Sequence, residues 1–329
     1  MKILVVGGAG YIGSICTEVL LNEGHDVGIF DNLVEGHRSA IDQRATFFPG
    51  DLANRAVIKD ALARFRPDAV MHFAASALVG ESMQDPSKYF RNNVANGLNL
   101  LDGMVELEIK NLIFSSTCAI FGPPERVPID ESLPMRPINP YGESKLMFES
   151  ALRWYNTIHG LKFVSLRYFN AAGASGQFGE HHRCETHLIP NVLKVALGET
   201  THVEIFGTDY ETPDGTCIRD YIHILDLARA HILALTAPKS EFYNLGTGGG
   251  SSVREVIEAG KKITGRDIPV VEKPRRPGDP PRLIASSAKI AKELGWKPQF
   301  QSLDAIEIHN TGAVCSHELL IAQIALKLG

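Results

Sequence analysis

The first half of the chain alternates short apolar runs with longer stretches whose apolar residues recur at helical spacing. The apolar runs indicate strands at 3–6, 27–31, 46–48, 69–74, 112–116 and 163–168. The stretches between them indicate helices at 12–23, 55–65, 86–107 and 141–159. Alternating strands and helices form βαβ units, and strands that are apolar nearly throughout are typical of a sheet covered on both faces. This pattern predicts an α/β fold with a doubly wound parallel sheet.

After residue 170 the rhythm changes. The pattern there indicates a loop at 171–185, a helix at 188–197, a strand at 203–206, a loop at 207–215, a helix at 226–235, a strand at 242–245 and a small α/β set at 252–264, 268–271 and 287–294. A length of 329 residues is typical of about two domains. We therefore predict a large domain at 1–170, rejoined by 221–246, and a smaller C-terminal α/β domain built from 171–220 and 247–329.

Composition excludes several classes of partner. The chain has 33 basic and 38 acidic residues, a net charge of −5, and no basic run, so nucleic acid is not an expected partner. No apolar run approaches the ~20 residues that span a bilayer, and the first six residues lead into glycines and indicate a strand instead of a secretory signal. The five cysteines are scattered without metal-binding spacing, which favours free thiols in a reducing cytoplasm. They are Cys16, Cys118, Cys184, Cys217 and Cys315.

A glycine-rich turn follows the first strand and opens the first helix. Gly7, Gly10 and Gly13 let the backbone turn sharply and approach a pyrophosphate, which the N-terminus of the helix attracts. Asp31 ends the second strand about twenty residues further on, where a carboxylate accepts hydrogen bonds from the ribose hydroxyls and repels a 2′-phosphate. Together they predict a Rossmann-type site for NAD, although Arg38 offers a partner for a 2′-phosphate. Asp51, after the third strand, either holds the adenine amino group or caps the next helix.

A second group of residues indicates redox chemistry at an alcohol carbon. Tyr141 and Lys145 lie four residues apart and share one face of a helix, so the ammonium stabilises a phenolate that can act as a base. Thr117 ends the fifth strand, at the sheet edge where ligands bind in doubly wound folds. Its hydroxyl is placed to hydrogen-bond a substrate oxygen beside the tyrosine.

These motifs resemble those of the extended short-chain dehydrogenase/reductase superfamily, and within it those of the UDP-glucose (UDP-galactose) 4-epimerases. The resemblance runs from Lys2 to about Leu303. It rests on GGAGYIGS (7–14), FDNL (30–33), GDL (50–52), HFAA (72–75), VGES (79–82), NNV (92–94), FSST (114–117), YGESK (141–145), LRYFN (166–170), GTDY (207–210), DGTCIRDYIH (214–223), YNLGTG (243–248) and RRPGD (275–279).

The resemblance implies roles for individual residues. Those expected to bind NAD are Gly7, Gly10, Tyr11, Ile12, Gly13, Asp31, Asn32, Asp51, Leu52, Phe73, Ala74, Asn92, Ser115, Lys145 and Phe169. Those expected to bind the UDP-sugar are Thr117, Tyr141, Asn170, His187, Leu188, Phe206, Arg219, Arg276, Asp279 and Leu283. Arginine pairs well with pyrophosphate, and an aromatic ring can stack on uracil. Within the chain alone, Phe206 can equally be core and Arg219 can pair with Asp220.

The implied activity is reversible inversion at C4 of a UDP-hexose through a 4-keto intermediate, with Tyr141 as base and a retained NAD. A UDP-N-acetylhexosamine or a UDP-pentose is an alternative substrate. A nucleotide-sugar dehydratase or decarboxylase is disfavoured, because Cys118 and Ala119 stand where dehydratases place an acidic pair. A non-catalytic NAD-sensing protein would not need Thr117, Tyr141 and Lys145 together.

The chain departs from the family pattern at several positions. Thr117 replaces a frequent serine, Ala77 stands where some relatives have a lysine near the NAD pyrophosphate, and His187 stands where an asparagine often meets the substrate phosphate. Leu283 has intermediate bulk at the position thought to admit or exclude N-acetylated sugars. After Leu303 the chain lacks the usual tryptophan-containing last helix, and 318–328 indicates a short amphipathic helix instead.

Two further expectations concern metals and assembly. His181, His182 and His187 invite a metal interpretation, but no carboxylate or cysteine spacing completes a site, so we expect no metal and a loop that faces substrate or solvent. The long helical stretches at 86–107 and 141–159 would pair with their copies in a homodimer, as the resemblance implies.

Overall fold

The computed structural model describes residues 1–183, 185–276, 279–304 and 306 of the chain. The predicted helix at 318–328 and the cysteines Cys184 and Cys315 lie outside the described residues. Within them, no helix has both the length and the apolar character that crossing a membrane requires.

A seven-stranded sheet dominates the described part of the chain, and its strands pair in the order β11-β6-β5-β4-β1-β2-β3, all parallel. Its strands are β1 (Lys2–Val6), β2 (Asp26–Asp31), β3 (Thr46–Pro49), β4 (Ala69–His72), β5 (Asn111–Thr117), β6 (Lys162–Tyr168) and β11 (Glu241–Leu245). This is the predicted doubly wound architecture, and β11 rejoins the sheet from the second half of the chain.

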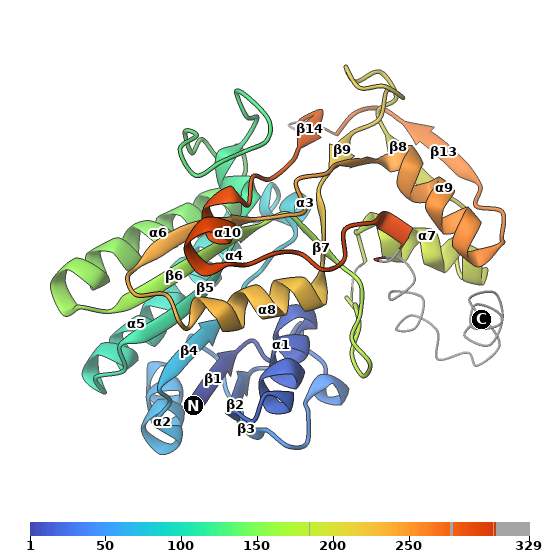
Figure 1. Cartoon of the computed structure of the whole chain (residues 1–329). Helices are drawn as coiled ribbons and strands as arrows, with labels where there is room; N and C mark the ends of the chain where they lie inside the picture. The colour runs from blue at the N-terminus through green and yellow to red at the C-terminus, as the bar shows by residue number, and fades with distance from the viewer. Residues whose placement is uncertain (184, 277–278, 305, 307–329) are drawn as a thin grey trace.

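Helices cover both faces of this sheet (Figure 1). Successive residues of β1 point to opposite faces: Ile3 and Val5 belong to one apolar cluster, and Leu4 and Val6 to another. The first cluster is closed by α1 (Tyr11–Asn22) and α8 (Ile224–Ala234), and the second by α2 (Arg55–Phe65), α5 (Asn96–Glu106) and α6 (Pro140–His159). Burial on both faces explains why these strands are apolar nearly throughout.

The smaller second part gathers beside the carboxyl ends of the sheet strands (Figure 1). Helices α7 (Leu188–Leu197) and α9 (Val253–Thr264) pack on the parallel pair β8 (Val203–Phe206) and β13 (Val270–Lys273). The remaining elements are β7 (Asn170–Ala172), β9 (Ile218–Arg219), β10 (Tyr221–His223), β12 (Ser251–Ser252), β14 (Arg282–Leu283) and α10 (Ala288–Leu294). These five short strands were not predicted, because strands of two or three residues depend on distant partners and leave no periodicity.

The predicted helix at 86–107 is the main local error. The structure divides it into α4 (Pro86–Tyr89), a π-helical segment η2 (Phe90–Ala95) and α5, and it adds α3 (Val79–Ser82) before it. Asp85 caps α4, and in η2 the side chain of Asn93 bonds Ser76 and Ser144. The other unpredicted turns are the 3₁₀ segments η1 (Arg38–Ala40) and η3 (Cys118–Phe121).

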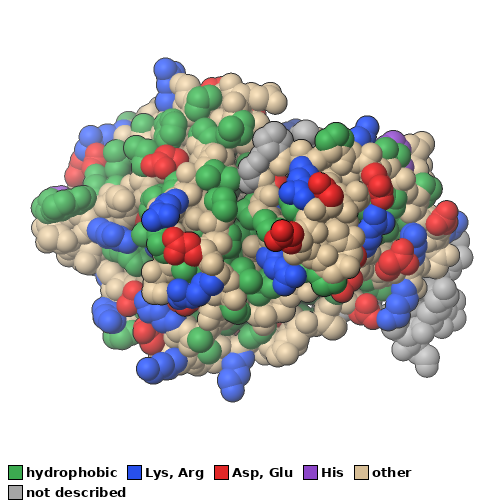
Figure 2. All heavy atoms as spheres, turned by 90° about the horizontal axis from the view of Figure 1, so that it is seen from above, with side chains coloured by type: hydrophobic (Ala, Val, Ile, Leu, Met, Phe, Trp, Pro, Cys, Tyr) green, Lys and Arg blue, Asp and Glu red, His purple; other side chains and the backbone are tan. Residues whose placement is uncertain are grey.

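Charges on the visible face in Figure 2 are mixed, with basic and acidic side chains side by side. Ion pairs of this kind include Arg254 with Glu272 and Lys273 with Glu204. Exposed pairs such as these contribute little to stability.

Asp220 is a buried polar residue that joins the sheet to the second part. Its buried carboxylate accepts hydrogen bonds from the Thr247 amide (2.8 Å) and hydroxyl (2.7 Å), and from the amides of Gly248 and Ala285 (both 3.0 Å). Burial raises the pKa of Asp220, and these hydrogen bonds oppose that rise. The loops that follow β11 and β14 are therefore both anchored to one carboxylate.

We expect Asp220→Ala to lower the free energy of unfolding by about 3 kcal/mol, because it leaves several buried amides without an acceptor. Urea denaturation followed by circular dichroism measures this change. The matched control is Asp209→Ala, since the Asp209–Arg275 pair is largely exposed and contributes less than about 1 kcal/mol. Equal effects of the two substitutions would contradict the anchoring role of Asp220.

Candidate functional site

The glycine-rich turn lies between β1 and α1, and each of its positions favours glycine for a different physical reason. Gly7 has a φ of +85°, and a Cβ there would lie 2.5 Å from the Ala74 amide nitrogen. A Cβ at Gly13 would lie 2.2 Å from the carbonyl oxygen of Gly7. At Gly10 a Cβ would meet that oxygen at 3.5 Å, an ordinary contact. Packing within the chain thus requires glycine at positions 7 and 13, and leaves an open approach at Gly10.

Within the part of the chain that the structure describes, the helix that starts at this turn has free donors for an anion. Gly10 is the N-cap of α1 and contributes no side-chain cap, so the first-turn amides of Tyr11 and Ile12 have no side-chain acceptor there. Aligned amides and the helix dipole favour a phosphate at this point. The open approach at Gly10 and the uncapped helix together fit the pyrophosphate of a dinucleotide.

Asp31 stands against the same turn, at the carboxyl end of β2. Its carboxylate accepts hydrogen bonds from the amides of Ala9 (3.0 Å) and Leu33 (2.8 Å). Beside it, the side-chain amide of Asn32 donates to the Asp51 carboxylate at 2.7 Å. The backbone amide of Ala53 donates to the same carboxylate at 2.8 Å. The structure therefore brings together three residues expected near the adenosine, and Asp51 makes a local turn without capping α2, whose cap is Asn54.

The other residues expected at NAD follow the carboxyl ends of several strands, except Asn92, which lies on the π-helical segment η2. The amides of Phe73 and Ala74 both donate to the carbonyl of Val6, next to the glycine turn. Asn92 donates to the Ser76 hydroxyl at 3.1 Å from the π-helical segment. Leu52 and Phe169 are buried, in the second apolar cluster and in a separate cluster around Phe121 respectively.

Thr117 and Tyr141 meet where β5 ends and α6 begins. The Thr117 hydroxyl forms a hydrogen bond with the Tyr141 phenol and accepts one from the Ala119 amide at 3.1 Å. Asn139 caps α6, accepting from the Gly142 amide at 2.8 Å, and so fixes the turn that carries Tyr141. Burial raises the pKa of Tyr141 to about 12, and the hydrogen bond with Thr117 opposes that rise.

Lys145 is buried one helical turn after Tyr141. Its ammonium donates to the Ser115 carbonyl at 2.8 Å and lies 4.9 Å from the centre of the Phe114 ring. Burial lowers the pKa of Lys145 to about 7, and the negative charge of Glu149 opposes this lowering. Ser115 itself hydrogen-bonds the Tyr168 hydroxyl through its side chain. The spacing of Tyr141 and Lys145 thus places both at the end of β5, as the sequence pattern predicts.

Glu149 is a site residue that the sequence analysis missed. It is fully buried and pairs with Arg167, with 2.6 Å between its Oε2 and the arginine Nη2. It also accepts hydrogen bonds from the hydroxyls of Ser116 and Ser165, both at 2.7 Å. A signal was present, because Tyr141, Lys145 and Glu149 follow each other at four-residue intervals on one helix face.

On the side expected to hold UDP, the predicted residues form three contacts. Arg219 pairs with Asp279, sixty positions later in the chain, and Leu283 of β14 lies beside Arg219 of β9. Arg276 lies over the Phe206 ring at 3.8 Å, so it covers one face of the ring expected to stack on uracil.

The residues around Asp220 complete this side. Arg219 directs its guanidinium to Asp279, while the carboxylate of the adjacent Asp220 binds the loop amides described above. Asn170 donates to the Asp220 carbonyl at 3.3 Å. The sequence suggested an ion pair between Arg219 and Asp220. Instead, Arg219 pairs with Asp279, and Asp220 binds the loop amides.

His187 and Leu188 lie at the start of α7, where His187 is the N-cap residue. The imidazole Nδ1 lies 2.8 Å from the Glu185 carboxylate and 2.9 Å from that of Glu180. Burial opposes a charge on this imidazole, but the two carboxylates outweigh it and raise the pKa of His187 to about 10. The fold therefore supplies two carboxylates beside the histidines, although the spacing in the sequence, with Glu185 and Cys184 nearby, did not complete a metal site.

Comparisons with known proteins agree with this geometry. The family model for the NAD dependent epimerase/dehydratase family matches residues 3–246. The UDP-glucose 4-epimerase of Lacticaseibacillus casei is 49% identical over 312 residues, covering 93% of this chain and 94% of that protein.

Solved structures give the same result. The UDP-glucose 4-epimerase of Brucella ovis in complex with NAD has a TM-score of 0.91 at 47% identity, covering 94% of this chain and 96% of that one. The enzyme of Bifidobacterium longum in complex with NAD+ and UDP has a TM-score of 0.91 at 39% identity, covering 95% and 97%. With the glycine turn, Asp31 and the Thr117–Tyr141–Lys145 group in place, the chain belongs to the NAD dependent epimerase/dehydratase family.

Proposed function

We propose that this chain is a UDP-glucose 4-epimerase, which interconverts UDP-glucose and UDP-galactose by reversible inversion at C4 with bound NAD. The observation that carries the proposal is the contact of Thr117 with Tyr141, with Lys145 one turn later, at the strand edge that also carries the dinucleotide turn. The names of the similar proteins, which include complexes with NAD and with UDP, support the same activity.

Tyr141 is the proposed base for the 4-hydroxyl of the sugar. Its pKa of about 12 in the protein alone is too high for this role, so positive charge must favour the phenolate. Lys145 supplies one such charge, and the oxidised nicotinamide ring adds another. Held by the glycine turn and Asp31, bound NAD would supply the redox chemistry, the reversible removal of a hydride from C4 of the sugar. Tyr141 holds the proton in between and returns it to the oxygen.

Lys145 and Glu149 have complementary parts in this mechanism. Burial lowers the pKa of Lys145 to about 7, and this value already includes the Glu149 carboxylate, which favours the charged form. The Arg167 guanidinium pairs with Glu149 within the core. We therefore assign Glu149 as a positioning residue for Lys145.

The remaining substrate residues would anchor the nucleotide while the sugar turns. Arg219 and Arg276 can neutralise a pyrophosphate, and Asp279 can accept from ribose hydroxyls. In this arrangement the large domain, 1–170 with 221–246, binds NAD. The smaller domain, 171–220 with 247–329, binds the UDP-sugar. Leu283, next to Arg219, would limit the room for an N-acetyl group.

Elimination chemistry of the dehydratase type is not favoured by the residues after Thr117. Cys118 is the first of them, and burial raises the pKa of its thiol to about 12, so it remains protonated and is a weak acid. Ala119 has no titratable group. The site thus has a base and a hydroxyl for redox epimerisation, and these two positions offer no acid for elimination.

We further propose that two copies of this chain form a homodimer through α6. Met147, Trp154 and Ile158 lie seven and four residues apart on one helix face, and 43%, 66% and 67% of each is exposed. Large exposed apolar side chains in a row are typical of an interface. We also propose a cytoplasmic location, which the free thiols of Cys16, Cys118 and Cys217 support.

We expect Tyr141→Phe to lower turnover of UDP-galactose by a factor of about 10³, because the variant lacks the group that takes the proton. The assay follows formation of UDP-glucose without added NAD, and NAD released on denaturation is measured alongside. The variant should retain its NAD. Near-wild-type turnover would contradict the proposed function, as would a product that has lost water or carbon dioxide.

We expect Thr117→Val to move the ascending limb of the pH–rate profile upward by about one unit. The hydroxyl stabilises the phenolate and so lowers the pKa of Tyr141, and its loss raises that pKa. Activity below the limb falls accordingly. Thr117→Ser is the matched control because it keeps the hydroxyl, and it should keep the wild-type limb. Identical profiles for both variants would contradict the role of Thr117.

We expect the double variant Trp154→Glu, Ile158→Glu to be monomeric in light scattering, because two charges cannot be buried in an apolar interface. Val271→Glu is the control, since Val271 is also exposed but lies on β13. A monomeric wild-type protein, or a variant that stays dimeric, would contradict the interface on α6.

A further inference from the structure

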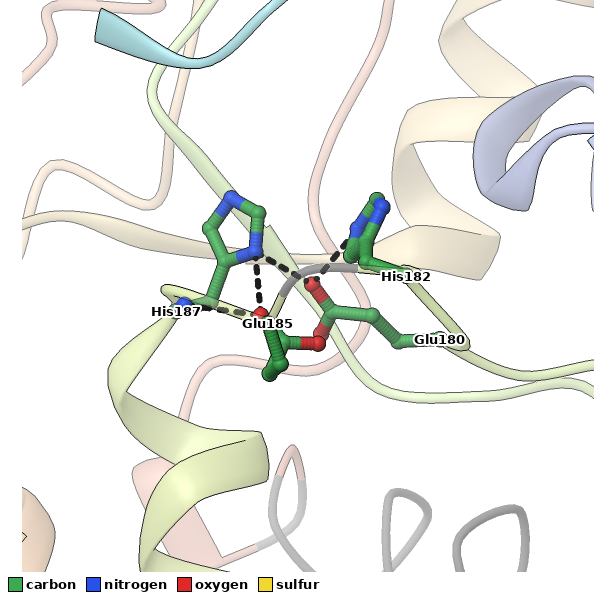
Figure 3. A group of neighbouring side chains, drawn as sticks. All are labelled: Glu180, His182, Glu185 and His187. Atoms are coloured by element: carbon green, nitrogen blue, oxygen red, sulfur yellow. Dashed lines mark hydrogen bonds and ion pairs between the residues drawn. The ribbon is translucent and has the colours of Figure 1, made fainter. Parts of the chain in front are cut away.

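Four potential metal ligands meet next to the dinucleotide turn, in the segment between β7 and α7. Glu180, His182, Glu185 and His187 each offer one ligand atom, and these atoms all lie within 4.8 Å of one another. Figure 3 shows both imidazoles directed toward the two carboxylates, with dashed lines meeting at Glu180 and Glu185. The cluster lies close to α1, since the ring of His182 is 6.2 Å from that of Tyr11, edge to face.

The carboxylates of this cluster are removed from solvent. Their side chains are 2% exposed for Glu180 and 4% for Glu185, whereas His182 and His187 are 34% and 48% exposed. The second oxygen of Glu180, Oε2, is buried and has no hydrogen-bond partner among the described residues. A buried carboxylate oxygen without a donor is costly, and it retains lone pairs for a cation.

We propose that Glu180, His182, Glu185 and His187 form a binding site for one divalent transition-metal ion of the zinc class. Two imidazole nitrogens and two carboxylate oxygens are a ligand set that zinc accepts and that magnesium does not prefer. The two carboxylates carry two negative charges, so a divalent ion leaves the buried centre neutral. The half-exposed histidines leave an entry path for the ion.

The spacing of the ligand atoms suits a small ion. His187 Nδ1 lies 2.8 Å and 2.9 Å from the two carboxylates, and His182 Nε2 lies 3.1 Å from Glu180. Metal–ligand distances of ~2.0–2.1 Å in a tetrahedron put ligands ~3.3 Å apart. To bind an ion, the ligand atoms that are now 2.8–3.1 Å apart must separate by a few tenths of an ångström. The ligand atoms that are furthest apart, within 4.8 Å, must move closer. The ion replaces the hydrogen bonds that now join the imidazole of His187 to both carboxylates, and the proton on Nδ1 is released to solvent.

The metal would fix the segment that leads into the substrate side. His187 is the N-cap of α7, and the hydroxyl of Tyr11 donates to the carbonyl of Gly173, which begins the same connection. One ion would hold the four ligands together between the start of α1 and the start of α7. The proposed role is structural.

The test measures zinc bound to the full chain with its NAD, purified without a polyhistidine tag. The protein is stripped with a chelator, incubated with zinc chloride, desalted and analysed by inductively coupled plasma mass spectrometry. We expect one zinc per chain, retained in excess magnesium chloride. Glu180→Gln and His182→Ala should each weaken zinc binding at least about tenfold. Zinc should also raise the melting temperature of the wild type.

Two control variants show whether side chains outside the cluster bind the ion. His181→Ala removes the neighbouring histidine, which stacks on His37, and Cys184→Ser removes the nearest cysteine in sequence. Both should keep one zinc per chain, and unchanged NAD content in every variant shows that it is folded.

Three results would overturn the proposal. A wild type that binds no zinc would show that the cluster is an ion-pair network only. Zinc binding that survives in both His182→Ala and Glu180→Gln would place the ion elsewhere on the chain. Zinc binding that is lost in Cys184→Ser would replace the two-histidine, two-carboxylate ligand set with one that includes a thiolate.

Discussion

A single buried carboxylate, that of Glu149, joins helix α6 to the two strands on which the candidate active site depends. It bonds Arg167 and Ser165 of β6 and Ser116 of β5, so it fixes the helix against the middle of the sheet. Breaking a buried ion pair by removing one partner is strongly unfavourable, so the helix has little freedom to slide. Tyr141 and Lys145 lie on the same helix face, two turns and one turn earlier. Their positions against the end of β5 follow from that attachment.

Several features were predictable because they depend on local order in the chain. The turn at Gly7–Gly13 needs glycine for contacts within a few residues or with the adjacent strand, so its spacing alone identifies it. The strands of the large sheet are buried on both faces, and their apolar runs mark them clearly. The i, i+4 spacing of Tyr141 and Lys145 is likewise a property of one helix.

Other features depend on contacts between distant segments, and no local pattern records them. Arg219 meets Asp279 only because β9 and β14 pair, and each of these strands has two residues. Glu149 shares a helix face with Tyr141 and Lys145, but its contacts with Ser116 and Ser165 depend on how the distant strands β5 and β6 cover that face. The carboxylates at 180 and 185 lie in irregular backbone, where neither helical nor strand spacing relates them to His182 and His187. The division of the 86–107 helix follows from a π-helical segment, which apolar periodicity does not distinguish from an α-helix.

The carboxylate of Asp220 has a consequence for where phosphate groups can bind. The loop Gly246-Thr247-Gly248-Gly249-Gly250 has the composition of an anion-binding loop, and its amides do bind an anion, but that anion is the chain's own side chain. The loop is thus an anion receptor filled from within. A nucleoside diphosphate cannot use these donors without expelling Asp220, which leaves its charge to other groups such as the guanidinium groups of Arg219 and Arg276. Long, flexible side chains can follow a ligand whose sugar rotates, whereas backbone amides in a rigid loop cannot.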